Sequence, residues 1–351
     1  MITYKDAGVD ISHEDRVIKA LVSQITFKRS DIKPADLGLH YAGAVEFGDY
    51  YLVLSTDGVG SKMIVAEMAN KFDTVGIDMI AMNVNDAICI GAEPVALVDY
   101  LAVGHITEEI AEQIGKGLNE GAKEANINIV GGETATLPDM IKGIDLAGTV
   151  LAIVKKDEII TGKDVKPGDL IVGLRSSGIH SNGLSLARKV FFDIAKLNIN
   201  DKLSYGKTVA EELLTPTRIY VKPVLEMIRG EEIDVKGLAH ITGGSFRKLK
   251  RLNDKVVYYI NDLPEPLPIF KEIQRLGNVP DEEMFRTFNM GVGFCVIVGS
   301  EEEAEKVIKI SDKYGISAKV IGKVVDEVNI NNKKIKSGAV VDYNGKHILL
   351  K

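Results

Sequence analysis

The segment from Thr74 to Ile90 places the strongest constraint on how this chain folds. Its length and composition predict a helix, and apolar residues occupy nearly every side of that helix, so it must be buried against other parts of the protein. The same segment contains four polar residues, namely Asp78, Asn83, Asn85 and Asp86. Because acidic side chains are almost never buried without a partner, the fold has to bring a cation to this helix.

Two kinds of cation can satisfy the acids of this helix. Asp78 and Asn85 are seven residues apart and share a face, and Asp86 lies near that face. A divalent metal is the partner that we favour, with Asp57 as a further ligand from elsewhere in the chain. A lysine or arginine side chain is the alternative.

Strand and helix signals alternate along the rest of the chain. Short apolar runs predict strands, and segments with a four-residue apolar repeat predict helices. The strands are expected at Tyr50–Ser55, Val95–Val103, Ile127–Val130, Ile144–Val154, Leu170–Leu174, Val256–Ile260, Val292–Val298 and Ala318–Val325. Further helices are expected from Thr107, from about Leu184, at Leu267–Leu276 and from Ser300, and Asn344-Gly345 predicts a hairpin.

A charged stretch from Lys155 to Asp169 interrupts this alternation. It contains two glycines and a proline, and the alternation of strands and helices begins again after it. This stretch is the best candidate for a domain boundary. We therefore expect an α/β or α+β fold with two domains, residues 1–165 and 166–351.

Composition excludes several classes of function. The 351 residues carry a net charge of −7, which disfavours nucleic acid as a main partner because phosphate backbones require a basic surface. No apolar run approaches the roughly 20 residues of a membrane span, and the N-terminus lacks the apolar core of a signal peptide. Cys89 and Cys295 form no C-x-x-C pair. We therefore expect a cytoplasmic protein with reduced thiols and no structural zinc.

The loop Thr56-Asp57-Gly58-Val59-Gly60 follows a predicted strand and has the chemistry of a metal and phosphate site. An acid at a strand end is well placed to hold magnesium near phosphates, and Gly58 and Gly60 let backbone N–H groups approach those phosphates. A plain Asp-Gly turn is the alternative. The standard P-loop and dinucleotide fingerprints are absent from the sequence, so a nucleotide would bind by another scheme.

Other glycine-rich stretches suit anions or metals. Gly131-Gly132-Glu133-Thr134 ends a predicted strand, where the glycines permit close backbone approach and Glu133 is able to serve a metal or a hydroxyl. Residues 176–183, Ser-Ser-Gly-Ile-His-Ser-Asn-Gly, precede a predicted helix and suit a phosphate, with a helix N-cap beside a surface histidine as the alternative. The stretch Arg286–Gly293, taken alone, reads as a glycine-rich turn.

Taken together and in order, these stretches resemble the phosphoribosylformylglycinamidine cyclo-ligases, also called aminoimidazole ribonucleotide synthetases. Each stretch is a weak signal alone, but the ordered set runs from residue 4 to about residue 325 and is specific. The matching stretches are Tyr4–Asp10, Thr56–Gly60, Gly76–Asp78, Asn85-Asp86, Gly91–Pro94, Gly131–Ala135, Ser176–Gly183, Pro216–Lys222, His240–Gly244 and Arg286–Gly293. The resemblance does not assign the segment from Ile330 to Lys351.

The resemblance implies a two-domain synthetase of the superfamily that includes selenophosphate synthetase and thiamine-phosphate kinase. In that superfamily the N-terminal domain binds ATP and magnesium, and the sheets of two such domains join into a dimeric β-barrel with ATP near the interface. The implied reaction is a dehydration. ATP phosphorylates the formamide oxygen of formylglycinamidine ribonucleotide, an amidine nitrogen attacks that carbon, and phosphate leaves. The implied partners are the ribonucleotide substrate and a second copy of the chain.

The positions of the motifs also imply roles for individual residues. Asp57 and Asp86 are expected to bind magnesium and, with His180, to form the catalytic set. Lys5 is expected to be a mobile N-terminal lysine that reaches the phosphates. ATP and magnesium are expected to contact Lys5, Asp57, Gly58, Gly60, Asp78, Asn85, Asp86, Gly131, Gly132, Glu133 and Thr134. The ribonucleotide is expected to contact Ser177, Gly178, His180, Ser181, Asn182, Gly183 and Arg218.

Two positions depart from the wider superfamily. His40-Tyr41 and His240 stand where several relatives carry aspartates, so metal ligation rests on fewer acids here, a trait shared with the cyclo-ligase branch. Two alternatives stay open, namely another ATP-using member such as a small-molecule kinase or an amidotransferase, and a non-catalytic nucleotide-binding protein. The stretches His180–Gly183 and Arg286–Asn289 argue against the first, and the presence of both metal-site acids argues against the second.

Overall fold

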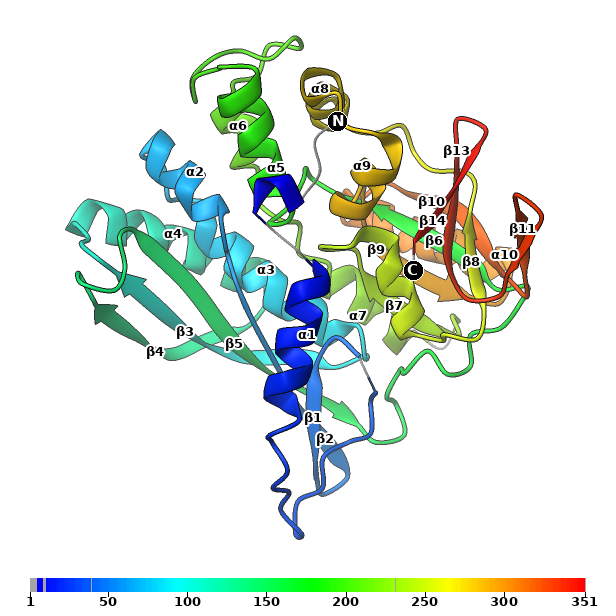
Figure 1. Ribbon diagram of the computed structural model, residues 1–351. Coiled ribbons are helices and arrows are strands. Elements are labelled where there is room, and N and C mark those ends of the chain that lie inside the picture. The colour runs from blue at the N-terminus through cyan, green and yellow to red at the C-terminus, as the bar shows by residue number, and fades with distance from the viewer. Residues whose placement is uncertain (1–4, 9–10, 39, 231, 351) are drawn as a thin grey trace.

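Two β-sheets, one in each half of the chain, form the framework of the protein (Figure 1). The computed structural model describes residues 5–8, 11–38, 40–230 and 232–350. Helices pack on both sheets, which gives the mixed α/β architecture expected from the sequence. Within these described ranges, no helix is both long enough and apolar enough to cross a membrane.

The first sheet has five strands in the order β1-β2-β5-β3-β4. Neighbouring strands are antiparallel except for β3 and β4, which run parallel. The strands are β1 (Gly43–Phe47), β2 (Tyr50–Gly58), β3 (Glu93–Val103), β4 (Asn128–Thr136) and β5 (Ile144–Lys155). The strands expected from Tyr50, Val95 and Ile144 are confirmed, and each is slightly longer than the apolar run that predicted it.

Helix α3 (Val75–Ile88) lies between this sheet and helix α4 (Glu108–Ala125). The two helices touch at Gly76, where a Cβ atom would lie 2.3 Å from the backbone nitrogen of Leu118. Almost every residue of α3 is buried, which confirms the burial predicted from its apolar surface. The polar residues of this helix must therefore find their partners inside the protein.

The first sheet also has exposed apolar surface. Leu54, Val98, Tyr100, Ile129 and Val130 all remain exposed on its strands. Strand β4 is an edge strand, and nearly all of its residues are exposed. Figure 1 shows α3, α4 and helix α2 (Lys62–Ala69) gathered over the other face. A single chain does not contain the expected dimeric barrel, and part of the apolar surface of its first sheet is exposed.

The second sheet has seven strands in the order β14-β13-β8-β10-β6-β9-β7. Strands β13 and β8 run parallel, and the other neighbours are antiparallel. The strands are β6 (Leu170–Arg175), β7 (Gly237–His240), β8 (Val257–Ile260), β9 (Val292–Val298), β10 (Ala318–Val325), β13 (Gly338–Tyr343) and β14 (Lys346–Leu350). The predicted hairpin at Asn344-Gly345 joins β13 to β14, with both turn residues at positive φ.

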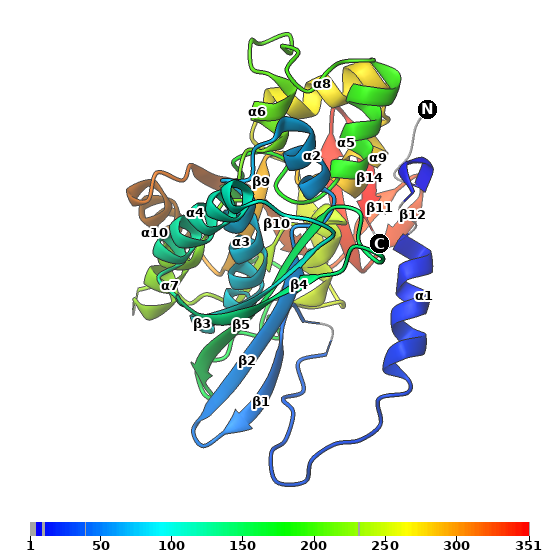
Figure 2. The same ribbon diagram turned by 90° about the vertical axis from the view of Figure 1, so that its left-hand side faces the viewer.

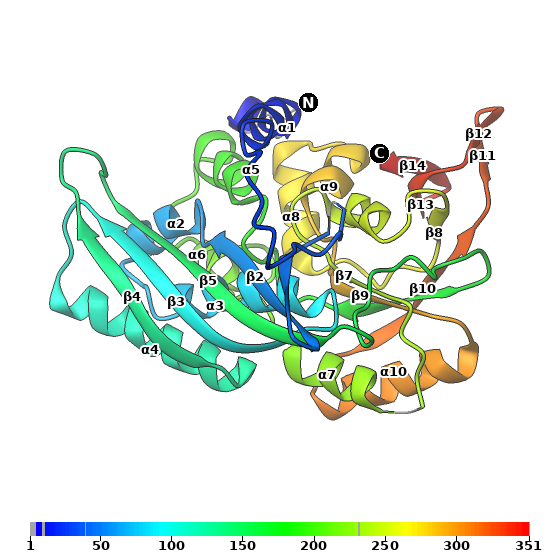
Figure 3. The same cartoon turned by 90° about the horizontal axis from the view of Figure 1, so that it is seen from below.

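Helices cover both faces of the second sheet, so β9 is buried along its whole length (Figure 3). One face carries α7 (Val221–Arg229) and α10 (Glu301–Lys313). The other carries α8 (Pro268–Gly277), α9 (Asp281–Thr287) and the 3-10 helix η3 (Ser245–Arg251). The remaining elements are α5 (Leu184–Arg188), the π-helix η2 (Lys189–Ile194), α6 (Val209–Leu213) and a ribbon of β11 (Val328–Ile330) and β12 (Lys333–Ile335).

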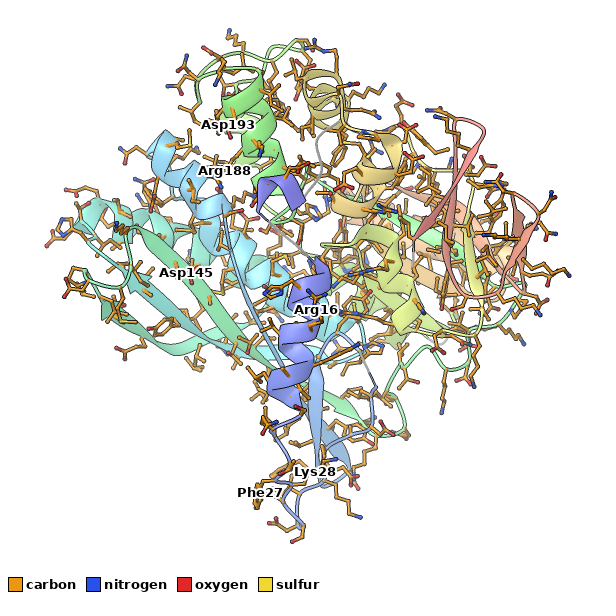
Figure 4. The ribbon with its side chains drawn as sticks, in the orientation of Figure 1. Arg16, Phe27, Lys28, Asp145, Arg188 and Asp193 are labelled. Carbon is orange, nitrogen blue, oxygen red and sulfur yellow. The ribbon has the colours of Figure 1, made fainter. Side chains whose placement is uncertain are left out.

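The N-terminal segment reaches from the second half of the chain to the first sheet. The 3-10 helix η1 (Lys5–Ala7) is tied to η2, where Lys189 Nζ donates a hydrogen bond to the carbonyl oxygen of Asp6. Helix α1 (Ile11–Val22) stands apart from the two sheets (Figure 2). Phe27 and Lys28 lie at the tip of the long connection from α1 to β1 (Figure 4).

Candidate functional site

Asp57 and Asp86 bring two carboxylates into one region from different elements. Asp57 lies near the end of β2, and Asp86 lies in the last turn of α3. Asn83 ties the strand to the helix, because its amide oxygen accepts from the Asp57 N–H at 3.0 Å and its amide nitrogen donates to the Asp57 carbonyl at 3.0 Å. Burial raises the pKa of Asp57, and the charge of Asp86 raises it further. Two acids in this situation favour a cation between them.

His240 reaches the same region from β7 in the second half of the chain. Its Nδ1 lies 2.8 Å from Asp86 Oδ1, and its Nε2 lies 3.5 Å from the amide nitrogen of Asn85. The backbone N–H of His240 donates to Cys89 Sγ at 3.2 Å. The ring is completely buried, so it holds the Asp86 carboxylate in one orientation. His240 therefore positions an acid instead of adding one.

Basic side chains from η3 face the two acids. Within the described part of the chain, the Lys248 Nζ has no hydrogen bond or ion pair. Burial, and after it the charge of Arg251, lower the pKa of Lys248 to about 8, while Asp86 and Asp57 act in the opposite direction. The Arg251 guanidinium lies 4.8 Å from the ring centre of Tyr41, a cation–π contact. The Tyr41 hydroxyl in turn donates to the Lys248 carbonyl at 3.3 Å.

This positive charge was not predicted from the sequence. Its signal is the run Arg247-Lys248-Leu249-Lys250-Arg251, which begins three residues after Gly244. His40 lies close enough to Arg251 and Asp86 to feel both charges. Burial, and after it the charge of Arg251, lower the pKa of His40 to about 4, and the charge of Asp86 opposes this effect. The neutral pair His40-Tyr41 therefore borders a cationic region.

Asp78 is buried in a polar network that joins the two halves of the chain. The Lys62 ammonium lies 2.8 Å from Asp78 Oδ2 and 2.9 Å from Oδ1, and both side chains are fully buried. Thr217 donates to the same carboxylate from its backbone N–H at 2.7 Å and from its hydroxyl at 2.6 Å. The Ser181 hydroxyl donates at 3.1 Å, and Lys62 also donates to the Thr215 carbonyl at 2.6 Å.

The network changes how two expected ligand residues are understood. Asp78 was expected to contact ATP or magnesium, but protein donors surround its carboxylate and solvent does not reach it. Lysine pairing, the alternative from the sequence, is what the structure shows at Asp78. Asn85 is engaged in a similar way, because its amide oxygen accepts from the Tyr220 N–H at 2.9 Å and its amide nitrogen donates to the Arg218 carbonyl at 2.8 Å. Both residues fix the second half of the chain against α3, and Asp86 remains the partly exposed acid of that helix.

The loop of residues 176–183 is braced by Asn289. The Ser176 hydroxyl donates to Asn289 Oδ1 at 3.0 Å, and the Asn289 amide nitrogen donates to the Gly178 carbonyl at 3.0 Å. Asn289 belongs to the stretch that read as a simple turn when taken alone. The structure gives it a specific task, which is to hold the loop expected to contact the ribonucleotide. The loop ends at Gly183, whose φ of 76° favours glycine.

His180 lies in the interior of this loop. Its side chain is 1% exposed, and its Nε2 accepts the Ser177 N–H at 3.2 Å. Burial lowers the pKa of His180 well below its usual range, so the ring is neutral. Its Nδ1 is buried and has no hydrogen-bond partner among the described residues. In this structure the ring shapes the loop from within, so His180 is not the surface histidine that was the alternative interpretation of this stretch.

Asn182 and Arg218 each keep an unused donor. The amide nitrogen of Asn182 and the Nε of Arg218 are buried without a hydrogen-bond partner in the ranges that the structure describes. Asn182 lies beside Gly243, since a Cβ atom built on Gly243 would be 2.9 Å from the amide oxygen of Asn182. Arg218 interacts electrostatically with Glu124 on α4. Burial raises the pKa of Glu124, and the charge of Arg218 partly offsets this rise. The two residues therefore face different parts of the protein.

The stretch Gly131–Thr134 lies on the edge strand β4. Asp57, Gly148, Asp99 and Gly132 pair in one row across β2, β5, β3 and β4. At about 4.8 Å per strand, Gly132 lies roughly 14 Å from Asp57. Asp99 was not predicted as a site residue. A Cβ at Gly132 would lie 2.2 Å from its carboxylate oxygen, and burial raises the pKa of Asp99.

Three further observations concern ATP and its metal. Gly58 directly follows Asp57, and Gly60, two residues further on, adopts a φ of 67°, which favours glycine. The side chain of Lys5 lies outside the described residues. Groups of three or more His, Cys, Asp or Glu side chains able to hold a metal do not occur among the residues described. A magnesium ion at Asp57 and Asp86 would therefore take its remaining ligands from phosphate and water.

We predict that Lys62→Met lowers the free energy of unfolding by about 3–5 kcal/mol, because it leaves the buried Asp78 carboxylate without its counter-charge. Denaturant unfolding of the two proteins measures this difference. Lys313→Met is the matched control, since it removes an exposed lysine that pairs with Glu226 at 2.9 Å, and it is expected to leave the free energy of unfolding nearly unchanged. Equal losses in the two variants would contradict the role given to the buried pair.

Comparison with known proteins identifies the family. Residues 40–154 match the family model described as AIR synthase related protein, N-terminal domain, and residues 166–331 match the model described as AIR synthase related protein, C-terminal domain. The phosphoribosylformylglycinamidine cyclo-ligase of Methanocaldococcus jannaschii is 89% identical over 350 residues, covering 100% of each chain. The protein of the same name from Pyrococcus horikoshii is 54% identical over 332 residues, covering 93% of this chain and 96% of its own.

A solved structure shares the fold at much lower identity. The hydrogenase maturation protein HypE in complex with ATP is 18% identical, with a TM-score of 0.62 over 86% of this chain and 84% of that chain. The full-length relatives above are far more similar in sequence, and they carry one common name. The chain therefore belongs to the phosphoribosylformylglycinamidine cyclo-ligase family.

Proposed function

We propose that this chain performs its family's reaction at the site around Asp57 and Asp86. The reaction is the ATP-dependent ring closure of formylglycinamidine ribonucleotide to aminoimidazole ribonucleotide, a step of purine biosynthesis that releases ADP and phosphate. The observation that carries the proposal is the meeting of two mutually repelling acids with the unpaired cation Lys248. Such a region suits a nucleotide with a divalent cation, because the acids bind the metal and the lysine binds phosphate oxygens.

The chemistry requires the protein to position groups and does not require a covalent intermediate. An amide oxygen is a poor leaving group and phosphate is a good one, so transfer of the γ-phosphoryl group to the formamide oxygen prepares the loss of that oxygen. An amidine nitrogen of the same molecule then attacks the carbon, and orientation by the protein lowers the barrier to this intramolecular step. Cys89 and Cys295 are buried, and burial raises the pKa of both thiols, which makes them poor phosphoryl acceptors.

The residues at the site fit a magnesium ion. Magnesium prefers carboxylate and phosphate oxygens and keeps several waters, so one or two protein carboxylates suffice. Asp57 and Asp86 supply them, and the burial and the neighbouring Asp86 charge that raise the pKa of Asp57 are effects that a bound cation would offset. When bound, magnesium would neutralise charge on the transferring phosphoryl group. The Asn83 amide and the His240 ring keep the two acids in place.

We assign ATP to residues 1–165, as an ATP-binding and dimerisation domain, and the ribonucleotide mainly to residues 166–351, as a C-terminal α/β domain. The HypE structure with ATP supports nucleotide binding in this fold. Gly58, Gly60 and Gly131–Thr134 would approach the nucleotide, and Lys5 would reach its phosphates. The loop of residues 177–183, with Arg218, would contact the ribonucleotide. The two free cysteines support the cytoplasm as the proposed location.

We further propose that two copies of the chain pair through their first sheets and form a barrel. The support is the exposed apolar surface of that sheet, on which Val130 is 67% exposed and Tyr100 is 44% exposed, and the unpaired edge of β4. Pairing would cover the edge strand and bury these side chains. It would also place the Gly131–Thr134 stretch of each chain at the interface.

We predict that Asp57→Asn and Asp86→Asn each slow ADP formation by at least about a hundredfold, because each removes charge that binds magnesium near the transferring phosphoryl group. Steady-state rates at varied magnesium and ATP measure the effect, and circular dichroism checks the fold. Asp49→Asn, in the exposed turn between β1 and β2, is the matched control and is expected to retain full activity. Near-normal activity in either site variant would contradict a magnesium-binding role for that residue and would favour a structural role in a turn or an ion pair.

We predict that the double variant Tyr100→Glu, Val130→Glu shifts the protein from dimer to monomer at micromolar concentration, because it places charge in the proposed apolar interface. Light scattering across a concentration series measures the change. Ile194→Glu is the control, since Ile194 is 43% exposed on η2 in the second half of the chain. A wild-type protein that is monomeric at these concentrations would refute the barrel.

A further inference from the structure

A cavity of about 480 Å³ lies between η3, α9 and the C-terminal strand β14. Gly244 and Arg247 line it from the η3 side, Glu282 and Arg286 from α9, and residues 347–350 from β14. Strand β14 belongs to the C-terminal segment to which the sequence resemblance gave no role. The cavity is also outside the set of residues expected to contact either ATP or the ribonucleotide.

The cavity carries uncompensated positive charge. In the described part of the chain, neither Arg247 nor Arg286 forms an ion pair or a side-chain hydrogen bond. Glu282 is the one acid in its lining, and it pairs with neither arginine. Guanidinium groups present several N–H donors in a fixed plane, an arrangement that matches the oxygens of a phosphate. Two arginines without an ion-pair partner among the described residues, one from η3 and one from α9, line one cavity and therefore favour a phosphate ester as its ligand.

The floor beside the arginines is built from glycine. Gly244 has a φ of 85°, and a Cβ at that position would lie 3.3 Å from two nitrogens of the Arg247 guanidinium. The preceding Gly243 lies against Asn182, whose amide nitrogen is buried without an acceptor. The Gly243-Gly244 loop thus lies against both Asn182 and Arg247, and larger residues in it would crowd these two side chains.

The cavity adjoins the site of the reaction. Arg247 precedes Lys248 in η3, and Lys248 lies within the electrostatic influence of Asp57 and Asp86. The same short helix therefore points one basic residue at the two acids and carries another in the wall of the cavity. A substrate that reacts at the acids and carries an anionic group at its other end would span the two places.

We propose that Arg247 and Arg286 bind the 5′-phosphate of the ribonucleotide substrate. The proposal rests on the function proposed above, which supplies a substrate with one phosphate monoester remote from the reacting formamide. Contacts with a remote phosphate hold the reacting end in position, so they contribute to turnover without touching the atoms that react. The triphosphate of ATP has the same chemistry, and the test below separates the two sources.

The test compares wild type with Arg247→Gln, Arg286→Gln and the double variant. Each single change is expected to raise KM for the ribonucleotide roughly 10- to 100-fold, the worth of a charged hydrogen bond, and to leave KM for ATP within about twofold. Wild type is expected to prefer the ribonucleotide strongly over the same compound without its phosphate, and the double variant is expected to lose that preference. Arg286→Lys should restore part of the affinity. Arg229→Gln is the control, as it removes an arginine that pairs with Glu93 on the surface.

A second measurement does not depend on turnover. Calorimetry with ribose 5-phosphate should show binding to wild type and none to the double variant, at equal thermal stability of the two proteins. An unchanged KM for the ribonucleotide in the folded double variant would overturn the proposal while leaving the family reaction intact. A rise in KM for ATP alone would overturn it by assigning the cavity to the nucleotide. Failure of wild type to convert the ribonucleotide would instead refute the proposed function, and ribose 5-phosphate binding would still report on the cavity.

Discussion

The buried ion pair between Lys62 and Asp78 is the interaction on which the rest of the structure depends. Both side chains are sealed from water, and the carboxylate also binds Thr217 and Ser181 from the second half of the chain. A buried charge that loses its partner is strongly destabilising, so the two halves have few alternative ways to pack. The pair thereby sets where the loops of the second half lie relative to α3, and those loops are the ones proposed to contact the ribonucleotide.

Helix α3 divides its polar residues between structure and chemistry. Asp78 and Asn85 bind the second half of the chain, and Asn83 clamps the end of β2. These three contacts hold Asp86 near Asp57, and the His240 ring then fixes the orientation of Asp86. Lys248 brings a positive charge to the same place without an ion-pair partner of its own among the described residues. The site therefore brings two mutually repelling acids close to Lys248, an arrangement that magnesium and a triphosphate would complete.

The sequence was sufficient where the signal is local. The apolar surface of α3 predicted its burial, the apolar runs predicted the longer strands, and Asn344-Gly345 predicted the last hairpin. The partner of a buried acid can come from a distant part of the chain, so the sequence could not decide whether a lysine or a metal ion pairs with Asp78. The structure shows that the partner is Lys62. Strand β7 is four residues long, too short for a pattern, so the approach of His240 to Asp86 had no visible signal. The basic run after Gly244 and the acid Asp99 inside an apolar strand were visible, but only the fold shows which way they face.

The central claim is that the site around Asp57 and Asp86 transfers a phosphoryl group from ATP to the formyl oxygen of the substrate. Substrate labelled with heavy oxygen at the formyl position tests it directly, because that oxygen must leave bonded to phosphorus. Mass spectrometry of the released phosphate is predicted to show one labelled oxygen atom per turnover. Unlabelled phosphate together with labelled water would contradict the claim, since it would mean that ATP hydrolysis drives only a conformational step and that the oxygen departs without phosphorylation.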